Sequence, residues 1–323
     1  MKLKVAVLAG GRSGEHEVSL NSADSIVRAM DPAKYDVARY FISKEGKWNP
    51  GPILPEPGAN PGIDVVFPVL HGTFGEDGTM QGLLELADLP YVGAAVLASA
   101  VSMDKEMMKR VARERSLPVV DSVTWYRGTP VPLTLPFGFP VFVKPANLGS
   151  SVGISKAKDR EELDAALALA AQYDRKIIVE RAVIGREFEC SVLGNDRPEA
   201  AIPCEILPSR DFYDYEDKYL LDRALTQVPA DIPPDLAVEI RRLAVECYRA
   251  VECEGMARVD FLFETATGKL FINEINSIPG FTSISMYPKM WEAAGLPYPR
   301  LIDRLIELAL ERQAQRRANR YSR

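Results

Sequence analysis

The first hundred residues alternate short apolar runs with helical stretches, and this order limits the folds open to the chain. Residues 4–9, 37–42 and 65–70 are predicted strands, because they are apolar, rich in β-branched residues and ended by turn-forming residues. Helical patterns cover 19–30 and 80–89. Strands that alternate with helices predict an α/β fold with a doubly wound parallel sheet that helices cover on both faces.

Two loops are expected to meet at one edge of that sheet. Residues 10–17 and 71–78 each follow a predicted strand, and a further short strand is predicted to begin at 91–92. The carboxyl ends of parallel strands carry the functional loops of such folds. The first loop lacks the G-x-G-x-x-G fingerprint, which argues against a nicotinamide-dependent oxidoreductase.

The length of 323 residues exceeds one typical core and suits two or three domains. Residues 129–140 hold four prolines and read as a connector. Strand-like runs at 141–144 and 177–180 flank a predicted helix at 159–173, which gives a second small domain. The predicted domains are residues 1–100, 101–185 and 186–323.

Two predicted strands on either side of a turn at 264–268 carry polar side chains on one face. Side chains alternate along a strand, so Arg258 shares a face with Asp260, and Glu274 shares one with Asn276. In a hairpin, the two carboxylates and the amide can converge. Oxygen ligands without His or Cys suit a hard cation such as Mg²⁺. A hairpin whose polar face meets water is the alternative.

A loop of small residues follows Lys144 over residues 145–153. Such a loop lets backbone N–H groups approach phosphate oxygens, and the lysine adds a positive charge. It does not have the Walker A order of residues. An ordinary Gly/Ser turn beside an exposed lysine is the alternative. Together with the oxygen cluster in the next segment, the loop predicts a magnesium nucleotide held between two domains.

Charge and composition exclude several classes of protein. A net charge of -6 argues against a nucleic-acid partner, and no run approaches the roughly 20 apolar residues that span a membrane. The start of the chain lacks the features of a signal peptide. Only two histidines are present, which argues against zinc. We expect reduced, buried thiols in a cytoplasmic protein, because no C-x-x-C spacing links Cys190, Cys204, Cys247 and Cys253.

The order of these segments resembles the ATP-grasp superfamily and, within it, the D-alanine–D-alanine ligase family. The matching segments are 10–19, 71–78, 103–105, 144–153, 212–219 and 273–285. The resemblance implies a three-domain architecture, in which the N-terminal sheet is followed by two α+β domains that sandwich ATP. It implies the ligation of two D-alanine molecules through an acyl phosphate, for peptidoglycan synthesis. It further implies ATP and two Mg²⁺ (or Mn²⁺) ions as cofactors, a homodimer and a cytoplasmic location.

The resemblance also implies a role for each matching residue. Glu15 would anchor the ammonium of the first D-alanine, and would join Ser150 and Tyr219 in ordering the active-site loop and moving a proton. Arg258 and the Gly280 N–H would stabilise the oxyanion. The implied D-alanine contacts are Glu15, Val18, His71, Arg258, Ser285 and Met286. The implied ATP contacts are Lys105, Lys144, Ser151, Glu180, Glu187, Phe212, Lys218 and Asn273. The implied metal ligands are Asp260, Glu274 and Asn276.

Each residue also has a simpler reading. Glu15 could be an acid that favours a helix N-terminus, and Ser150 could cap a turn. His71 could be a satisfied structural histidine, Lys105 a solvated helix residue, and Tyr219 a core aromatic. Among functions, the alternatives are an ATP-grasp ligase for another acceptor, including the ester-forming variant, and a nucleotide-binding module without catalysis. Family members that make the ester tend to lack the tyrosine, so Tyr219 favours the dipeptide product.

Overall fold

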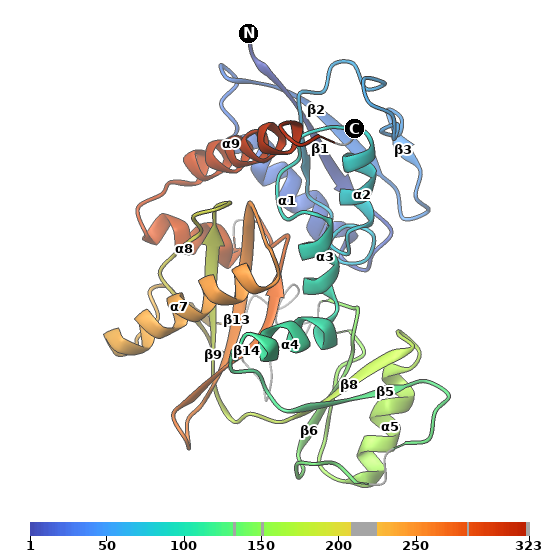
Figure 1. Ribbon diagram of the computed structural model, residues 1–323, viewed down its shortest axis with the longest axis vertical. Helices are drawn as coiled ribbons and strands as arrows, with labels where there is room; N and C mark the ends of the chain where they lie inside the picture. Colours follow the sequence, from blue (N-terminus) through green and yellow to red (C-terminus); the bar gives the residue numbers. More distant parts are fainter. Residues whose placement is uncertain (132–133, 150–151, 208–224, 283, 321–323) are drawn as a thin grey trace.

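The computed structural model describes residues 1–131, 134–149, 152–207, 225–282 and 284–320. These residues form three sheets: an N-terminal sheet of order β3-β2-β1-β4, a central sheet of order β5-β8-β6-β7, and a C-terminal sheet of order β12-β11-β9-β13-β14 with β10 beside β9. Along the longest axis of the molecule, the C-terminal sheet lies between the N-terminal sheet and the central sheet with its helix α5 (Arg160–Ala170) (Figure 1).

The N-terminal sheet confirms the predicted doubly wound arrangement. Strands β1 (Leu3–Gly10), β2 (Tyr35–Ile42) and β4 (Val65–Pro68) are parallel, and only the short edge strand β3 (Trp48–Asn49) runs against them. Helices α1 (His16–Ala29), α2 (Thr79–Leu86) and α9 (Tyr298–Arg317) pack around it.

Alternation along β1 explains why both faces are covered. Val5 and Val7 point into a core that contains Ile26 of α1 and residues of α9. Ala6 and Leu8 point the other way, into a core with the buried residues of α2. A strand that is apolar on both faces needs a helix layer on each side, so the continuous apolar run of β1 fits this position.

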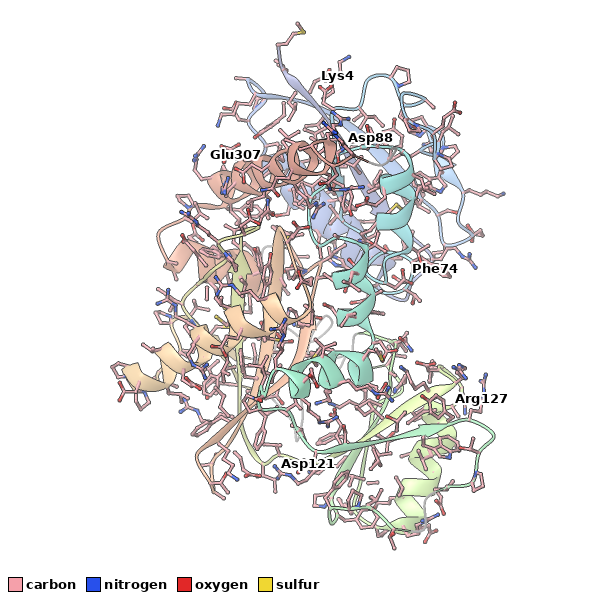
Figure 2. The ribbon with its side chains drawn as sticks, viewed as in Figure 1. Lys4, Phe74, Asp88, Asp121, Arg127 and Glu307 are labelled. Atoms are coloured by element: carbon pink, nitrogen blue, oxygen red, sulfur yellow. The ribbon has the colours of Figure 1, made fainter. Side chains whose placement is uncertain are left out.

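Helix α9 returns the end of the chain to the N-terminal sheet (Figure 1). Arg317 Nη2 donates to Asp88 Oδ2 at 3.0 Å, and Asp88 is labelled beside α9 in Figure 2. The buried Arg312 donates through Nη2 to the Tyr91 carbonyl at 2.7 Å. The C-terminal helix therefore completes a core that was begun by the first residues, although it falls in the predicted third domain of 186–323.

The central sheet is antiparallel and small. It consists of β5 (Ser122–Tyr126), β6 (Val141–Pro145), β7 (Ser155–Ala157) and β8 (Lys176–Arg181), with α5 packed on one face. Asp159 caps α5 by accepting a hydrogen bond from the Glu162 N–H at 2.9 Å. Two helices, α3 (Val96–Met103) and α4 (Lys105–Glu114), connect this sheet to the first one.

The C-terminal sheet is built on the long strands β9 (Gly185–Leu193), β13 (Met256–Glu264) and β14 (Lys269–Asn276). The short strands are β10 (Glu199–Ala200), β11 (Cys204–Leu207) and β12 (Leu225–Gln227). Helix α7 (Pro234–Ala250) covers the face that includes Val259 and Phe261, while α8 (Met286–Ala293) contacts β9. The alternate residues of β13, Arg258 and Asp260, therefore point away from α7.

Some local expectations needed correction. The strand predicted at 91–92 is only a bridge between Tyr91 and Val66, because the chain turns away at Gly93, where φ is +95°. Helices α3 and α4 are separated at Asp104, which has an extended backbone and caps α4 by accepting from the N–H groups of Glu106 and Met107. Helix α8 and strand β5 were not expected.

The four cysteines are free and buried, as expected for structural thiols. Burial raises the pKa of Cys190 and of Cys247 to about 12, so these thiols are poor nucleophiles at neutral pH. Within the described ranges, no helix combines the length and apolar character of a membrane span.

Candidate active site

A cavity of about 250 Å³ lies between the central sheet and the C-terminal sheet. Strands β6 and β8 supply one side, and β9, β13 and β14 supply the other. Residues 148–149 of the predicted phosphate loop also line it. Its charged and amide-bearing lining includes seven of the predicted site residues: Lys105, Lys144, Glu180, Glu187, Asp260, Asn273 and Glu274.

Lys144 and Glu180 lie on the same face of the central sheet. Phe142 stands opposite Glu180 across β6 and β8, and Lys144 is two residues further along the same strand. Lys144 Nζ lies 2.6 Å from Glu180 Oε2 and donates to Asn273 Oδ1 at 3.3 Å. Burial alone disfavours the charged lysine, but the Glu180 carboxylate outweighs it and raises the pKa of Lys144. Lys144 is therefore a fixed positive charge at the cavity.

Lys105 reaches the cavity from the first turn of α4. Its Nζ donates to the Leu148 carbonyl at 2.8 Å and lies 3.5 Å from Glu274 Oε2. Its backbone N–H donates to the Ala146 carbonyl at 3.0 Å. The side chain is buried, so the reading as a solvated helix residue is wrong. Lys105 ties the helix to the predicted phosphate loop and places a second cation at its base.

The predicted hairpin of β13 and β14 is confirmed, and its polar face turns toward the cavity. Asp260 stands directly opposite Glu274 across the two strands. Asn276 Nδ2 donates to Asp260 Oδ2 at 3.0 Å. The three side chains thus converge as their spacing predicted, and a hairpin with a solvated polar face is the wrong reading.

The chemistry of this group fits a hard divalent cation. The described residues contain no group of three or more His, Cys, Asp or Glu side chains that could hold a metal ion, so the chain's own contribution to this site is two carboxylates and one amide. Asp260 and Glu274 offer carboxylate oxygens, and Asn276 offers an amide. Mg²⁺ is bound by a few such oxygens and completes its shell with water and phosphate.

Arg258 is held between two carboxylates. Its Nε donates to Asp260 Oδ1 and its Nη2 to Asp260 Oδ2, both at 2.7 Å, and Nε lies 3.2 Å from Glu189 Oε2. Burial opposes the charged guanidinium, but Asp260 and Glu189 outweigh it and raise the pKa of Arg258 further. A paired, planar guanidinium is rigid, which suits a hydrogen-bond donor that must be in place before reaction.

Glu15 brings the N-terminal sheet to the phosphate loop. It occupies the position before α1, as the simpler helix-terminal reading expects. Its Oε2 atom lies 2.7 Å from where a Cβ of Gly72 would stand, and 3.2 Å from where a Cβ of Gly149 would stand. Side chains at either glycine would crowd this carboxylate. The loops after β1 and β4 therefore meet at one edge, as predicted, and they meet the loop after β6 there.

His71 joins the N-terminal sheet to the loop that follows β14. Nδ1 lies 3.0 Å from the Ile278 carbonyl, and Nε2 lies 3.1 Å from Ser22 Oγ. Ser22 Oγ also accepts from the Phe281 N–H at 3.3 Å. Burial opposes protonation, but Glu76, 3.5 Å from Nδ1, helps to raise the pKa of His71. The ring is satisfied by protein groups, so its structural reading holds, and its contact with substrate stays a prediction.

The predicted acceptor residues cluster before α8. Ser285 Oγ accepts from the Thr282 N–H at 3.0 Å and lies 2.8 Å from Thr282 Oγ1. Met286 begins α8 and is buried, and Gly280 lies in the same loop. Val18 is buried in the first turn of α1. The role of each with D-alanine stays a prediction.

Some predicted residues lie outside the described part of the chain: Ser150, Ser151, Phe212, Lys218 and Tyr219. The structure also brings in residues that the sequence did not single out. Glu189 follows Glu187 by two positions on β9, and this spacing could have indicated that both share a face. Ser22 and Lys109 gave no local signal, because their partners are far away in the sequence.

Comparison with known proteins gives consistent matches over nearly the whole chain. The family model described as "D-ala D-ala ligase C-terminus" matches residues 130–307, and "D-ala D-ala ligase N-terminus" matches residues 4–60 and 54–94. A D-alanine–D-alanine ligase of Solibacter usitatus is 70% identical over 325 residues, covering 100% of both chains.

Solved structures agree with these matches. The D-alanine–D-alanine ligase of Coxiella burnetii has a TM-score of 0.86 and 40% identity, covering 98% of this chain and 96% of that one. The VanG D-Ala:D-Ser ligase of Enterococcus faecalis has a TM-score of 0.85 and 34% identity, covering 96% of this chain and 100% of that one. Two ligases with different named acceptors thus share this fold.

Proposed function

The chain belongs to the D-alanine–D-alanine ligase family, and we propose that its ATP lies in the cavity between the central and C-terminal sheets. Its fold is the ATP-grasp fold. The chain is an ATP-dependent ligase that joins two D-alanine molecules to D-alanyl-D-alanine through an acyl phosphate, for peptidoglycan synthesis. The residue roles that follow are proposals.

One observation supports the ATP site above all others. Lys105 and Lys144 stand on one side of the cavity, and Asp260 and Glu274 stand on the other. Phosphoryl transfer needs positioning and charge neutralisation rather than covalent help from the protein. Two lysines that face an oxygen cluster supply both: the lysines bind phosphate oxygens, and the carboxylates bind the cation that accompanies the nucleotide.

The first step makes the acyl phosphate. The carboxylate of the first D-alanine attacks the γ-phosphorus of ATP, the bond to the β-phosphate oxygen breaks, and ADP leaves. Glu15 holds the ammonium of this D-alanine beside the loop that contains Gly149. Lys144 and Lys105 stabilise the negative charge on the transferred group. We assign Ser151, Glu187, Asn273, Phe212 and Lys218 to nucleotide contacts by their family positions.

The second step makes the peptide bond. The amine of the second D-alanine attacks the acyl carbonyl, and the tetrahedral intermediate expels phosphate. Arg258 and the Gly280 N–H donate to its oxyanion, while Glu15, Ser150 and Tyr219 order the loop and move the amine proton. Ser285 and Met286 receive the carboxylate of the second D-alanine, and Val18 and His71 lie at the first. An acyl phosphate hydrolyses readily, so the site must exclude water while this intermediate is present.

Asp260, Glu274 and Asn276 are the proposed ligands for Mg²⁺ or Mn²⁺, with two ions expected. A bound divalent ion would neutralise phosphate charge as the γ-phosphoryl group is transferred. The protein side contributes the fixed hairpin that keeps these oxygens opposite one another.

A homodimer and a cytoplasmic location are further proposals that come from the family resemblance. Light scattering during size-exclusion chromatography would test the dimer: a mass near 71 kDa, twice the 35.7 kDa chain, supports it, and the single-chain mass contradicts it.

The test of the function is ADP release from MgATP with D-alanine, with L-alanine as the control. We expect release that depends on D-alanine, with D-alanyl-D-alanine as the product. D-Serine and D-lactate serve as rival acceptors, because the similar enzyme of Enterococcus faecalis is a D-Ala:D-Ser ligase. A mixed product formed in preference to D-alanyl-D-alanine would overturn the acceptor assignment.

A further inference from the structure

Lys109 is a fully buried lysine for which the proposed reaction has no use. It lies on α4, one turn after Lys105, and its side chain is 0% exposed. Its Nζ is 2.9 Å from Glu180 Oε1. The other oxygen of the same carboxylate is 2.6 Å from Lys144 Nζ. One buried carboxylate is thus shared by two lysines that come from different elements.

Only one of these two lysines faces the cavity. Lys144 and Glu180 line it, whereas Lys109 stands behind Glu180. Neither Lys109 Nζ nor Glu180 Oε1 has a well-aligned hydrogen-bond partner within the described ranges. Each buried charge is therefore stabilised mainly by Coulomb attraction to the other. Burying a lysine is costly, and hydrophobic packing could fill this position more cheaply. Stability alone therefore does not explain why a lysine occupies position 109.

Charge balance supplies that reason. Burial favours the neutral form of Glu180, but Lys109 and Lys144 outweigh it and lower the pKa of Glu180 to about 2, so the carboxylate stays ionised. With Lys144 alone, a buried carboxylate 2.6 Å away would cancel the charge of that lysine. Burial lowers the pKa of Lys109, and the adjacent Glu180 carboxylate opposes that shift. With Lys109 in its charged form, the three groups carry one net positive charge, and Lys144 is the member at the cavity.

We propose that Lys109 is a positioning residue for the nucleotide. It balances the negative charge of Glu180 from behind the cavity wall. The positive charge of Lys144 is then available to the phosphates of ATP. This inference rests on the proposed ATP site. It also gives the Glu180 carboxylate an electrostatic role in place of a direct contact with ATP.

The first experiment replaces Lys109 by methionine, which has a similar length and no charge. We expect MgADP to bind roughly tenfold more weakly to Lys109→Met in calorimetric titration, because the site loses one unit of positive charge. The KM for D-alanine should stay within about twofold, since the first D-alanine is held elsewhere. Unchanged MgADP affinity in a folded Lys109→Met protein would overturn the inference.

The decisive experiment is the double variant Lys109→Met/Glu180→Gln. It removes both buried charges and leaves Lys144 with its own charge, so the net charge of the group equals that of the natural protein. We expect the double variant to bind MgADP within about threefold of the natural protein. Because it leaves no uncompensated buried charge, it should fold even if Lys109→Met does not. Affinity that stays tenfold weaker in a folded double variant would overturn the proposal.

Arg110→Met is the matched control, because it removes a positive charge from the exposed side of the same helix. It should bind MgADP within about twofold of the natural protein. The inference and the proposed function fail separately. If the natural protein neither binds MgADP nor releases ADP, the proposed function falls with it. If the natural protein binds MgADP and Lys109→Met binds it equally well, only the inference falls.

Discussion

The two walls of the cavity carry opposite charge. We call Lys105, Lys144 and Glu180 the basic wall, with Lys109 behind Glu180, and we call Arg258, Asp260, Glu274, Glu187 and Glu189 the acidic wall. Lys109 and Lys144 share the single carboxylate of the basic wall, whereas Lys105 lies 3.5 Å from Glu274 of the acidic wall. In the acidic wall, one arginine pairs with two of the carboxylates.

This difference shows how one cavity can hold a polyanion without a strongly basic chain. The basic wall can bind phosphates directly. The acidic wall would repel them, since like charges a few ångströms apart cost on the order of 4 kcal/mol at an effective dielectric constant of 20. A divalent cation on the acidic wall would convert that repulsion into attraction, so phosphate binding should depend on metal at the acidic wall and not at the basic wall. The four predictions below test this contrast.

The largest effect is expected at the arginine of the acidic wall. Arg258→Ala should lower kcat by roughly two to three powers of ten, because the tetrahedral intermediate loses a fixed donor. Steady-state kinetics with D-alanine and MgATP measures this, and thermal unfolding checks that the protein still folds. Arg242→Ala, on the exposed side of α7, is the control and should be nearly neutral. Unchanged turnover would remove Arg258 from the mechanism.

The next effect distinguishes the walls by their metal dependence. Asp260→Asn should raise the half-saturating Mg²⁺ concentration roughly tenfold or more, because a carboxylate ligand loses its charge. A magnesium titration of ADP release measures it. Glu264→Gln lies on the same strand outside the cavity and is the control. If the two variants have equal magnesium dependence, Asp260 is not a ligand.

A substitution in the basic wall should change nucleotide affinity instead. Lys144→Met should raise the KM for ATP roughly tenfold at saturating Mg²⁺, because the phosphates lose a charged partner. Extra magnesium should not restore it. Lys34→Met removes a lysine that pairs with Asp303 far from the cavity, and it should leave the KM for ATP unchanged. Rescue by magnesium would erase the proposed distinction between the walls.

The smallest effect is on stability against pH. The folded pKa of Glu180 is lowered to about 2 from its ordinary 4.5, so its stabilising contribution is complete above about pH 4.5 and is lost as pH falls toward 2. In that window the unfolded chain binds a proton that the folded chain does not, so the folded state loses stability as pH falls. Denaturant unfolding from pH 6 to pH 3 should show a shallower decline for Glu180→Gln. Parallel declines would contradict the assignment.

Much of this fold could be predicted from local pattern. Strands β1, β2 and β4 of the first sheet and the hairpin of β13 and β14 follow from residue periodicity, which needs no knowledge of distant partners. Short strands at sheet edges, such as β10 and β12, and the short helix α8 were missed. Segments of two to eight residues carry too little periodicity to stand out from loops.

The candidate site divides in the same way. The pairing of Asp260 with Glu274 could be predicted, because side chains alternate along each strand and a single turn joins the two strands. Glu189 and Lys109 could not, because their partners Arg258 and Glu180 are about 70 residues away along the chain and meet them only through sheet pairing and helix packing. Their own neighbours in the sequence give no hint of burial.

The sequence by itself therefore determined many of the elements and the family, and it predicted most of the residues proposed for the site, since these depend on short-range order and on motifs. The tertiary structure decided which of these residues share charge. It placed a lysine of α4 behind a carboxylate of β8, and it returned α9 to the first sheet. Coulomb interactions and burial depend on distance in space and on exclusion of water, and only the packed chain fixes both.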